Sequence, residues 1–178
     1  MNHNIFERVH PCLVDVNSYI GNINGVFNAS IIKSSPVGQT IMQGEGAGPG
    51  PTSSALMSDL YSILRGNIKY PFITPYKLRK ITKQFNCSNY SYSCYLRFDV
   101  KDKPGVLSSI TKNLGENKIS IEKLMQIPDK KKRTASINII THKTIEKRII
   151  KCLHELKKNK YIIKSPTFIR VGDINGNW

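Results

Sequence analysis

Cysteine is scarce in this sequence, and long apolar runs are absent. The four cysteines, Cys12, Cys87, Cys94 and Cys152, form no C-x-x-C pair, which argues against a zinc knuckle. So few cysteines in 178 residues also argue against a disulfide framework, and we expect reduced thiols in a cytoplasmic protein. No apolar run approaches the roughly 20 residues of a membrane-spanning helix. The N-terminus lacks the apolar core of a secretory signal, so we expect no leader and no membrane partner.

Acidic residues are few, with 12 Asp and Glu against 27 Lys and Arg, giving a net charge of +15. Such a balance is compatible with a nucleic-acid partner. Ile, Asn and Lys are abundant throughout, however, as in proteins of AT-rich genomes, where lysine is the default solvated residue. The only dense basic run, 130–133, is short and suits a solvated hairpin turn or a phosphate contact. We favour the solvated turn and a protein that does not bind nucleic acid.

A glycine- and proline-rich stretch, 44–51, stands directly before an apolar-patterned helix. Glycine lets the backbone approach a ligand, and a helix N-terminus presents free N–H groups to an electron-rich group. Pro51 stands where G-x-G-x-x-G needs its third glycine, so this is no Rossmann fingerprint. The alternative interpretation is a plain turn before a helix.

The first half of the chain predicts three strands and one helix. Residues 5–14, 24–32 and 37–43 are rich in β-branched and aromatic residues. The helix begins near Pro51 and ends at Gly66, a suitable C′ residue. Because so few elements cannot close a core, we expect an exposed apolar surface over residues 1–65. Pro- and Asn-containing residues 67–91 predict a linker.

The second half predicts the order βαββαβ. Residues 92–100 alternate with a period of two, and a helix follows from about Asp102, which either caps that helix or serves a ligand. Strands at 119–127 and 135–139, a helix at about 144–157 and a strand at about 161–171 complete a ferredoxin-like sandwich. The third strand lacks the aromatic residues of an RNA-recognition motif. Residues 172–178 form a tail.

A series of short motifs in the first half resembles the end of the catalytic region of homoserine dehydrogenase, in that family's order and at about its spacing. The motifs are Arg8-Val9-His10-Pro11, Asn24-Gly25-Val26-Phe27-Asn28-Ala29, Val37-Gly38-Gln39-Thr40, Gly46-Ala47-Gly48, Pro51-Thr52-Ser53-Ser54-Ala55 and Asp59-Leu60. In the second half, Asp102-x-Pro104-Gly105-Val106-Leu107 and Ile119-Ser120-Ile121 resemble the ACT domain, a regulatory module that binds amino acids. The resemblance implies an α+β fold: a fragment of a mixed-sheet catalytic domain, followed by a βαββαβ ferredoxin-like (ACT) domain.

The two resemblances also imply sites and partners. By the first, Gly46, Ala47, Gly48 and Thr52 line the pocket of a nicotinamide cofactor, NAD or NADP, which binds only together with the family's nucleotide domain. By the second, Asp102, Gly105, Val106 and Ser120 lie at the effector site, where threonine or another amino acid binds between two copies in a homodimer.

The family's nucleotide domain and its catalytic lysine and carboxylates have no counterpart here, so we predict no catalytic residue and no metal site. The domains expected are 1–66 (end of the catalytic region), 67–91 (linker), 92–171 (ACT domain) and 172–178 (tail). The complete enzyme interconverts L-homoserine and L-aspartate 4-semialdehyde in threonine and methionine biosynthesis. We expect this chain to be inactive alone and to need a separate N-terminal chain. The alternative is a free-standing ACT-type amino-acid-binding module.

Overall fold

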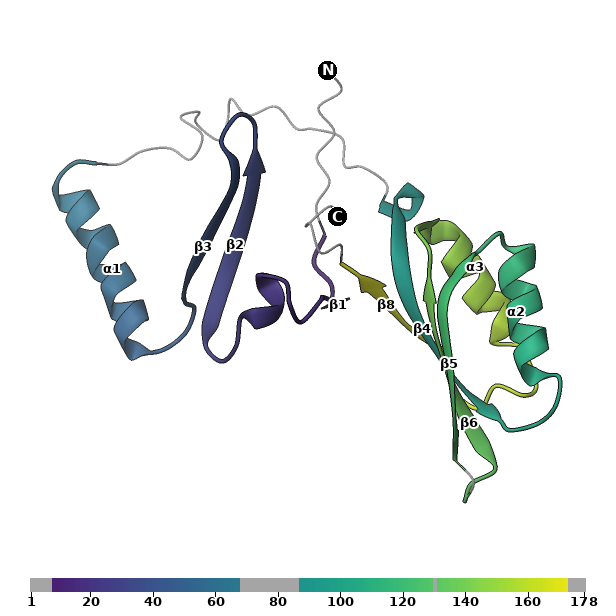
Figure 1. The fold of residues 1–178 in the computed structure, drawn as a ribbon. Helices are drawn as coiled ribbons and strands as arrows, with labels where there is room; N and C mark the ends of the chain where they lie inside the picture. The colour runs from purple at the N-terminus through teal and green to yellow at the C-terminus, as the bar shows by residue number, and fades with distance from the viewer. Residues whose placement is uncertain (1–7, 68–86, 130, 173–178) are drawn as a thin grey trace. The chain divides into compact units, whose positions relative to one another are not determined.

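The computed structural model describes residues 8–67, 87–129 and 131–172 of the chain (Figure 1). By its contacts the chain divides into two units. One joins Met1–Asp15 to Gln84–Trp178, and the other is Val16–Lys83. The predicted linker and tail lie largely outside the described residues. The domain boundaries expected from the sequence therefore stay predictions.

The unit Val16–Lys83 consists of a short 3-10 turn, a hairpin and one long helix. The turn, η1, is Ile20–Asn22, and strands β2 (Phe27–Ser34) and β3 (Gly38–Glu45) pair antiparallel. Their register matches Phe27 with Glu45 and Ser34 with Gly38. The second and third predicted strands are thus present, as a two-stranded sheet.

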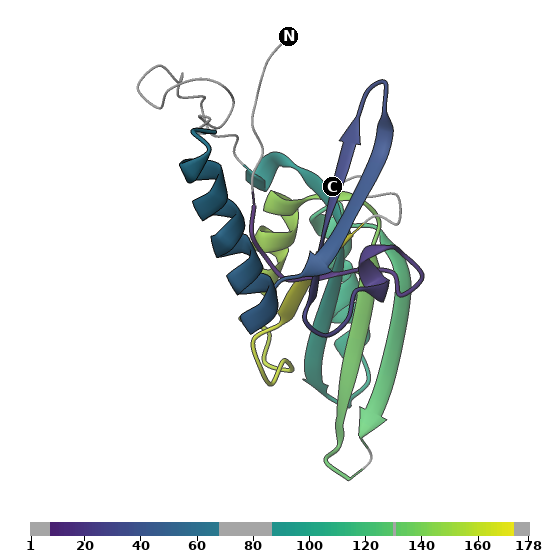
Figure 2. The same cartoon turned by 90° about the vertical axis from the view of Figure 1, so that its left-hand side faces the viewer.

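Helix α1, Pro49–Leu64, begins two residues earlier than the sequence indicates (Figure 2). Gly48 is its N-cap at φ 127°, a backbone conformation that favours glycine, and Pro49 occupies the first turn, where a missing N–H costs nothing. The helix ends as predicted at Gly66, which has φ 71°. The N–H of Gly66 donates to the carbonyl of Ile63, and that of Asn67 to Ser62, which forms a Schellman motif.

None of the described residues of this unit is buried. Its large apolar side chains face solvent on α1 and on both strands, with Leu64 of α1 72% and Met42 of β3 53% exposed. One face of α1 carries three further exposed apolar side chains, those of Leu56, Leu60 and Ile63. Isolated hairpins and single helices are marginal in water, so this unit needs apolar contacts beyond its own residues to be stable.

The other unit is a ferredoxin-like sandwich in the predicted element order. Its elements are β4 (Ser91–Lys101), α2 (Val106–Glu116), β5 (Ile121–Asp129), β6 (Thr134–Thr141), α3 (Glu146–Leu156) and β8 (Thr167–Val171), with the 3-10 turn η4 (Cys87–Asn89) before β4. The strands run in the order β8-β4-β6-β5, and each pair is antiparallel. A two-residue strand, β7 (Thr144–Ile145), pairs with the start of β4.

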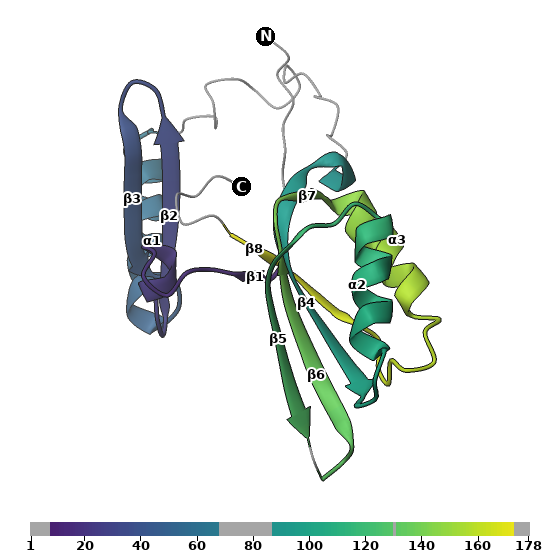
Figure 3. The same ribbon diagram turned by 45° about the vertical axis from the view of Figure 1, so that its right-hand side comes forward.

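Both helices of this unit cover one face of the sheet (Figure 3). Alternate residues of β4, among them Leu96 and Phe98, meet Ile110 and Leu114 of α2 and Ile149 of α3, all fully buried. The period-two and helical patterns of the sequence therefore formed the core that they predicted. The opposite face of the sheet carries no helix within the unit.

A fifth strand extends this sheet from the N-terminal end of the chain. β1, Cys12–Leu13, lies parallel to β8, and the N–H of Gly172 donates to the carbonyl of Leu13 at 2.7 Å. A strand was predicted at 5–14. Among its described residues, only Cys12 and Leu13 pair with another strand. They pair with the ferredoxin-like sheet rather than with β2 and β3.

The chain is therefore an α+β protein, as predicted. The part of the chain that the structure describes contains no helix long and apolar enough to cross a membrane.

Candidate functional site

A cavity of about 390 Å³ lies at the connection between β4 and α2. Residues 100–107 form most of its wall, and Gln126 and Ile137 contribute from β5 and β6. The cavity thus holds three of the four residues expected at an effector site, namely Asp102, Gly105 and Val106.

Local backbone geometry explains how this connection is built. Gly105 is the N-cap of α2 and has φ 85°, which suits glycine. The N–H of Asp102 donates to the carbonyl of Arg133 at 3.0 Å, which ties the connection to the start of β6. The helix N-terminus presents N–H groups and the positive end of its dipole to this region, as a carboxylate requires.

Asp102 does not cap the helix. The N-cap is Gly105, three residues later, and no side chain caps α2. The sequence interpretation of Asp102 as an N-cap is therefore wrong, because the turn through Pro104 and Gly105 delays the helix start. The Asp102 carboxylate is exposed between Lys101 and Lys103 at the cavity wall.

Ser120 lies elsewhere. It is exposed and directly precedes β5, and its carbonyl accepts a hydrogen bond from the N–H of His142. The eleven residues of α2 separate Ser120 from Gly105, so one copy of the chain does not bring the two together. The cavity instead includes Gln126, which was not predicted from the sequence. No local pattern marks this residue, because it comes to the helix side only through its pairing with buried Ile137 of β6.

The glycine loop connects β3 to α1 as the sequence indicated. The N–H of Gly46 donates to the carbonyl of Val26 at 2.8 Å, and a Cβ on Gly46 would overlap the side chain of Asn28. The N–H of Thr52 donates to the carbonyl of Gly48 at 3.2 Å within the first turn of α1. Gly46, Ala47 and Gly48 are exposed, so the loop presents open backbone at a helix N-terminus.

A buried ion cluster at the far end of the sheet was not foreseen. Glu146, the first residue of α3, is only 3% exposed. Its carboxylate accepts hydrogen bonds from Arg8 at 2.6 and 3.3 Å and from Arg170 at 2.6 and 2.9 Å. Both guanidinium groups also lie within 6.0 Å of the Tyr92 ring centroid. The cluster joins residues from the beginning, middle and end of the chain.

The pKa of Glu146 reflects two opposing causes. Burial raises the pKa, but the hydrogen bonds and charges of Arg170 and Arg8 outweigh burial and hold it below its usual value. The carboxylate is therefore ionised and acts as the counter-ion of both arginines.

Neither the thiols nor the carboxylates offer an obvious reactive centre. Burial raises the pKa of Cys94 and of Cys152 to about 12, so both remain protonated. Among the described residues no group of three His, Cys, Asp or Glu side chains is placed to hold a metal ion.

Comparison with known proteins gives the two halves separate matches. The family model for homoserine dehydrogenase matches residues 3–61, and that for the ACT domain matches residues 95–159. The homoserine dehydrogenase of Helicobacter pylori is 34% identical over 167 residues, covering 92% of this chain and 38% of that protein. The Neisseria gonorrhoeae enzyme is 32% identical, covering 94% of this chain and 40% of that protein.

Comparison with solved structures points to the same family. The solved structure of a homoserine dehydrogenase from Thiobacillus denitrificans matches with a TM-score of 0.80 and 29% identity, covering 98% of this chain and 40% of that one. The chain therefore spans about two fifths of the length of these relatives. It belongs to the homoserine dehydrogenase family and corresponds to the C-terminal part of its members, the end of the catalytic region followed by an ACT domain.

Proposed function

We propose that this chain is the amino-acid-sensing C-terminal part of a homoserine dehydrogenase, with threonine as its effector. The observation that carries the proposal is the cavity at the start of α2, which combines a helix N-terminus with the carboxylate of Asp102. A free amino acid needs both, because its carboxylate suits the helix N–H groups and its ammonium suits a carboxylate. Val106 and Leu107 offer an apolar contact for a short side chain.

Isothermal titration of the purified chain with L-threonine tests this proposal. Asp102→Asn removes the charge that faces the ammonium, and we expect an affinity loss of about tenfold, the effect of one charge-assisted hydrogen bond. Glu116→Gln is the matched control, because Glu116 is 60% exposed at the other end of α2 and should leave binding unchanged. Absence of heat with threonine and with other amino acids would refute the proposal.

Two copies of the ACT domain would complete the effector site. β5 forms one end of the sheet, so its outer backbone groups are open to pairing with a second copy. Ser120 lies at the start of this edge strand, and a partner copy could bring it near the cavity from which it is separated within one chain. Sedimentation equilibrium with and without threonine measures this pairing.

The catalytic role requires more than this chain. We propose that Gly46, Ala47, Gly48 and Thr52 border the nicotinamide end of NAD or NADP in an assembled enzyme, which interconverts L-homoserine and L-aspartate 4-semialdehyde. The exposed backbone of the β3–α1 loop supports close approach of a cofactor. The chain alone is inactive, because hydride transfer needs a bound and oriented cofactor.

The unit Val16–Lys83 has no buried residue among those described. This supports the proposal that the catalytic domain needs further protein to be complete. The unit's exposed side chains on α1, β2 and β3 suit contact with the remainder of a catalytic domain. An assay of the chain with homoserine and either cofactor should give no turnover, whereas turnover would contradict the proposal. Cytoplasmic location is part of this proposal, in keeping with free thiols at Cys12, Cys94 and Cys152.

The second candidate is a free-standing amino-acid-binding module. Every buried residue in the described part of the chain lies in the ACT-containing unit, which favours this candidate, since that unit has the core needed for independent folding. Threonine binding without any gain of dehydrogenase activity on adding a homoserine dehydrogenase nucleotide domain would select this candidate.

A further inference from the structure

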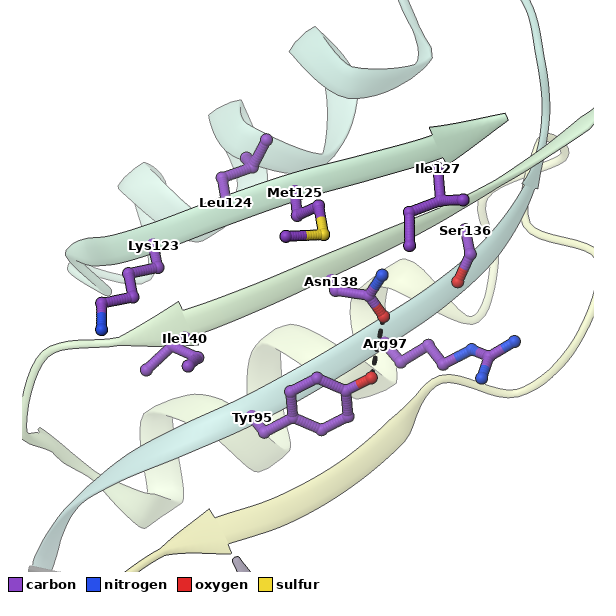
Figure 4. A pocket seen from close by; sticks show the side chains of 9 residues that line it. All are labelled: Tyr95, Arg97, Lys123, Leu124, Met125, Ile127, Ser136, Asn138 and Ile140. Atoms are coloured by element: carbon purple, nitrogen blue, oxygen red, sulfur yellow. Dashed lines mark hydrogen bonds between the residues drawn. The ribbon is translucent and has the colours of Figure 1, made fainter. Parts of the chain in front are cut away.

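One face of the ACT sheet is not covered by the helices of its unit. This face contains a groove. A groove of about 620 Å³ runs over β4, β6 and β5 (Figure 4). A volume of this size lies within the roughly 300–1,000 Å³ of small-molecule sites. None of the residues proposed for cofactor or effector lines it.

The strand register arranges the groove in three cross-strand rows. The first contains Tyr95, Ile140 and Lys123, the second Arg97, Asn138 and Met125, and the third Ser136 and Ile127. Apolar side chains therefore lie beside one another on the β5 side. Met125 and Ile127 are 61% and 52% exposed, an unusual state for two residues on one strand face.

Polar groups line the centre. The hydroxyl of Tyr95 donates to Oδ1 of Asn138 at 2.8 Å, which fixes the amide and leaves its nitrogen without a partner among the described residues (Figure 4). The hydroxyl oxygen of Ser136 is buried and has no hydrogen-bond partner in the described part of the chain. The centre thus offers hydrogen-bonding capacity that the fold does not use.

The two cations of the groove differ in their surroundings. Arg97 contacts the carboxylate of Asp99 at 3.2 Å, so its charge is partly neutralised. Lys123 forms no ion pair with any described residue. An adjoining hollow at the Arg97 and Ile127 end is lined by Asp99 and Asp129 and also by Lys132 and Lys164, and Lys132 pairs with Asp129. Of the two cations that line the groove itself, Lys123 is therefore the one without a carboxylate partner among the described residues.

We propose that this groove binds a small amphipathic organic anion, with its carboxylate at Lys123 and its apolar body along Ile140, Met125 and Ile127. Lys123 and Ile127 are four residues apart, a span of about 13 Å on an extended strand. This length suits a medium-chain carboxylate. The uncompensated charge at one end and the apolar floor fix the orientation of such a ligand.

The groove is separate from the effector cavity. Ile137 and Gln126 of that cavity face the helices, whereas Ser136, Asn138 and Met125 face the opposite side of the same strands. Side-by-side pairing through β5 would extend the sheet without covering either face. Both ligands could therefore bind one chain together, so this proposal stands or falls independently of threonine binding.

Titration of the ¹⁵N-labelled chain with sodium decanoate, followed by amide chemical shifts, tests the proposal. We expect saturable shifts concentrated on residues 95–97, 123–127 and 136–140. Lys123→Gln should weaken binding about fivefold, the upper range for an exposed ion pair. Lys112→Gln on α2 is the matched control, because it removes the same charge from the helix-covered side and should have no effect.

Two controls separate this site from general apolar binding. 1-Decanol should bind the groove more weakly than decanoate and should not respond to Lys123→Gln. The proposal is overturned if decanoate shifts only residues of α1, β2 and β3, or if Lys112→Gln weakens binding as much as Lys123→Gln. Decanoate shifts absent from β4, β5 and β6 would overturn it equally.

Discussion

Glu146 is the residue whose environment departs most from what its type leads one to expect. A carboxylate that is 3% exposed is costly unless it is paired, and here two arginines pair with it. Its position at the start of α3 adds a favourable interaction with the helix dipole. One side chain therefore holds the beginning of the chain, α3 and β8 together.

Glu146→Gln should destabilise the ACT-containing unit by about 3 kcal/mol, because it leaves two partly buried guanidinium groups without a counter-ion. Urea unfolding followed by circular dichroism measures the change. Glu116→Gln makes the same substitution at an exposed carboxylate and should change stability by less than about 0.5 kcal/mol. Equal effects of the two variants would show that the cluster contributes nothing special.

The same residue gives a pH dependence. Because the folded-state pKa of Glu146 lies below its ordinary value of 4.5, the contribution of Glu146 to stability is fully present above about pH 4.5. That contribution is lost as the pH falls through the lowered folded pKa. Urea midpoints measured from pH 7 to pH 3 should therefore converge for the natural chain and Glu146→Gln at the acid end. A constant difference across this range would contradict the assignment.

Predictions for single residues were confirmed where the structural cause lies in neighbouring residues of the sequence. Gly66 ends α1 because its φ of 71° needs glycine, and Leu96 and Phe98 are buried because the period of two in residues 92–100 directs alternate side chains inward. The pairing of Arg8 with Glu146 was invisible, since 138 residues separate them and no periodicity links them. Of the two alternatives for Asp102, the helix cap is wrong, because Gly105 in the αL conformation is the N-cap of α2.

At the scale of elements, the two units differ in burial. β4 and β6 lie in the centre of the ACT sheet and carry most of its buried residues, whereas β2, β3 and α1 bury none. Element type was predictable in both units, because strand and helix patterns depend on neighbours in sequence. The attachment of β1 to β8 was not, because two residues carry no register signal of their own.

Amide hydrogen exchange should report this difference directly. Protection depends on the free energy of opening, so amides of β4 and β6 should exchange at least about 100-fold more slowly than those of β2, β3 and α1. Mass spectrometry of peptides from the exchanged chain measures both sets in one sample. Comparable protection in the two units would mean that the unit Val16–Lys83 is stabilised within the isolated chain.

At the scale of the whole molecule, the chain combines an ACT domain that contains the buried core with a segment of a catalytic region. The sequence predicted this combination through motifs, whose order and spacing agree with the matches to homoserine dehydrogenase at residues 3–61 and the ACT domain at 95–159. The cavity at the start of α2 was predictable only in part. Gln126 and Ile137 enter it through strand pairing between β5 and β6, which depends on the tertiary fold.

The measurement that tests this account most directly is a chemical-shift map of the ¹⁵N-labelled chain titrated with L-threonine. The account predicts saturable shifts centred on residues 102–107, at the cavity between β4 and α2, with further shifts near Ser120 if two copies pair. D-threonine serves as the stereochemical control and should bind more weakly. Shifts confined to other surfaces, or no shifts at any concentration, would contradict the assignment of this chain as an amino-acid sensor.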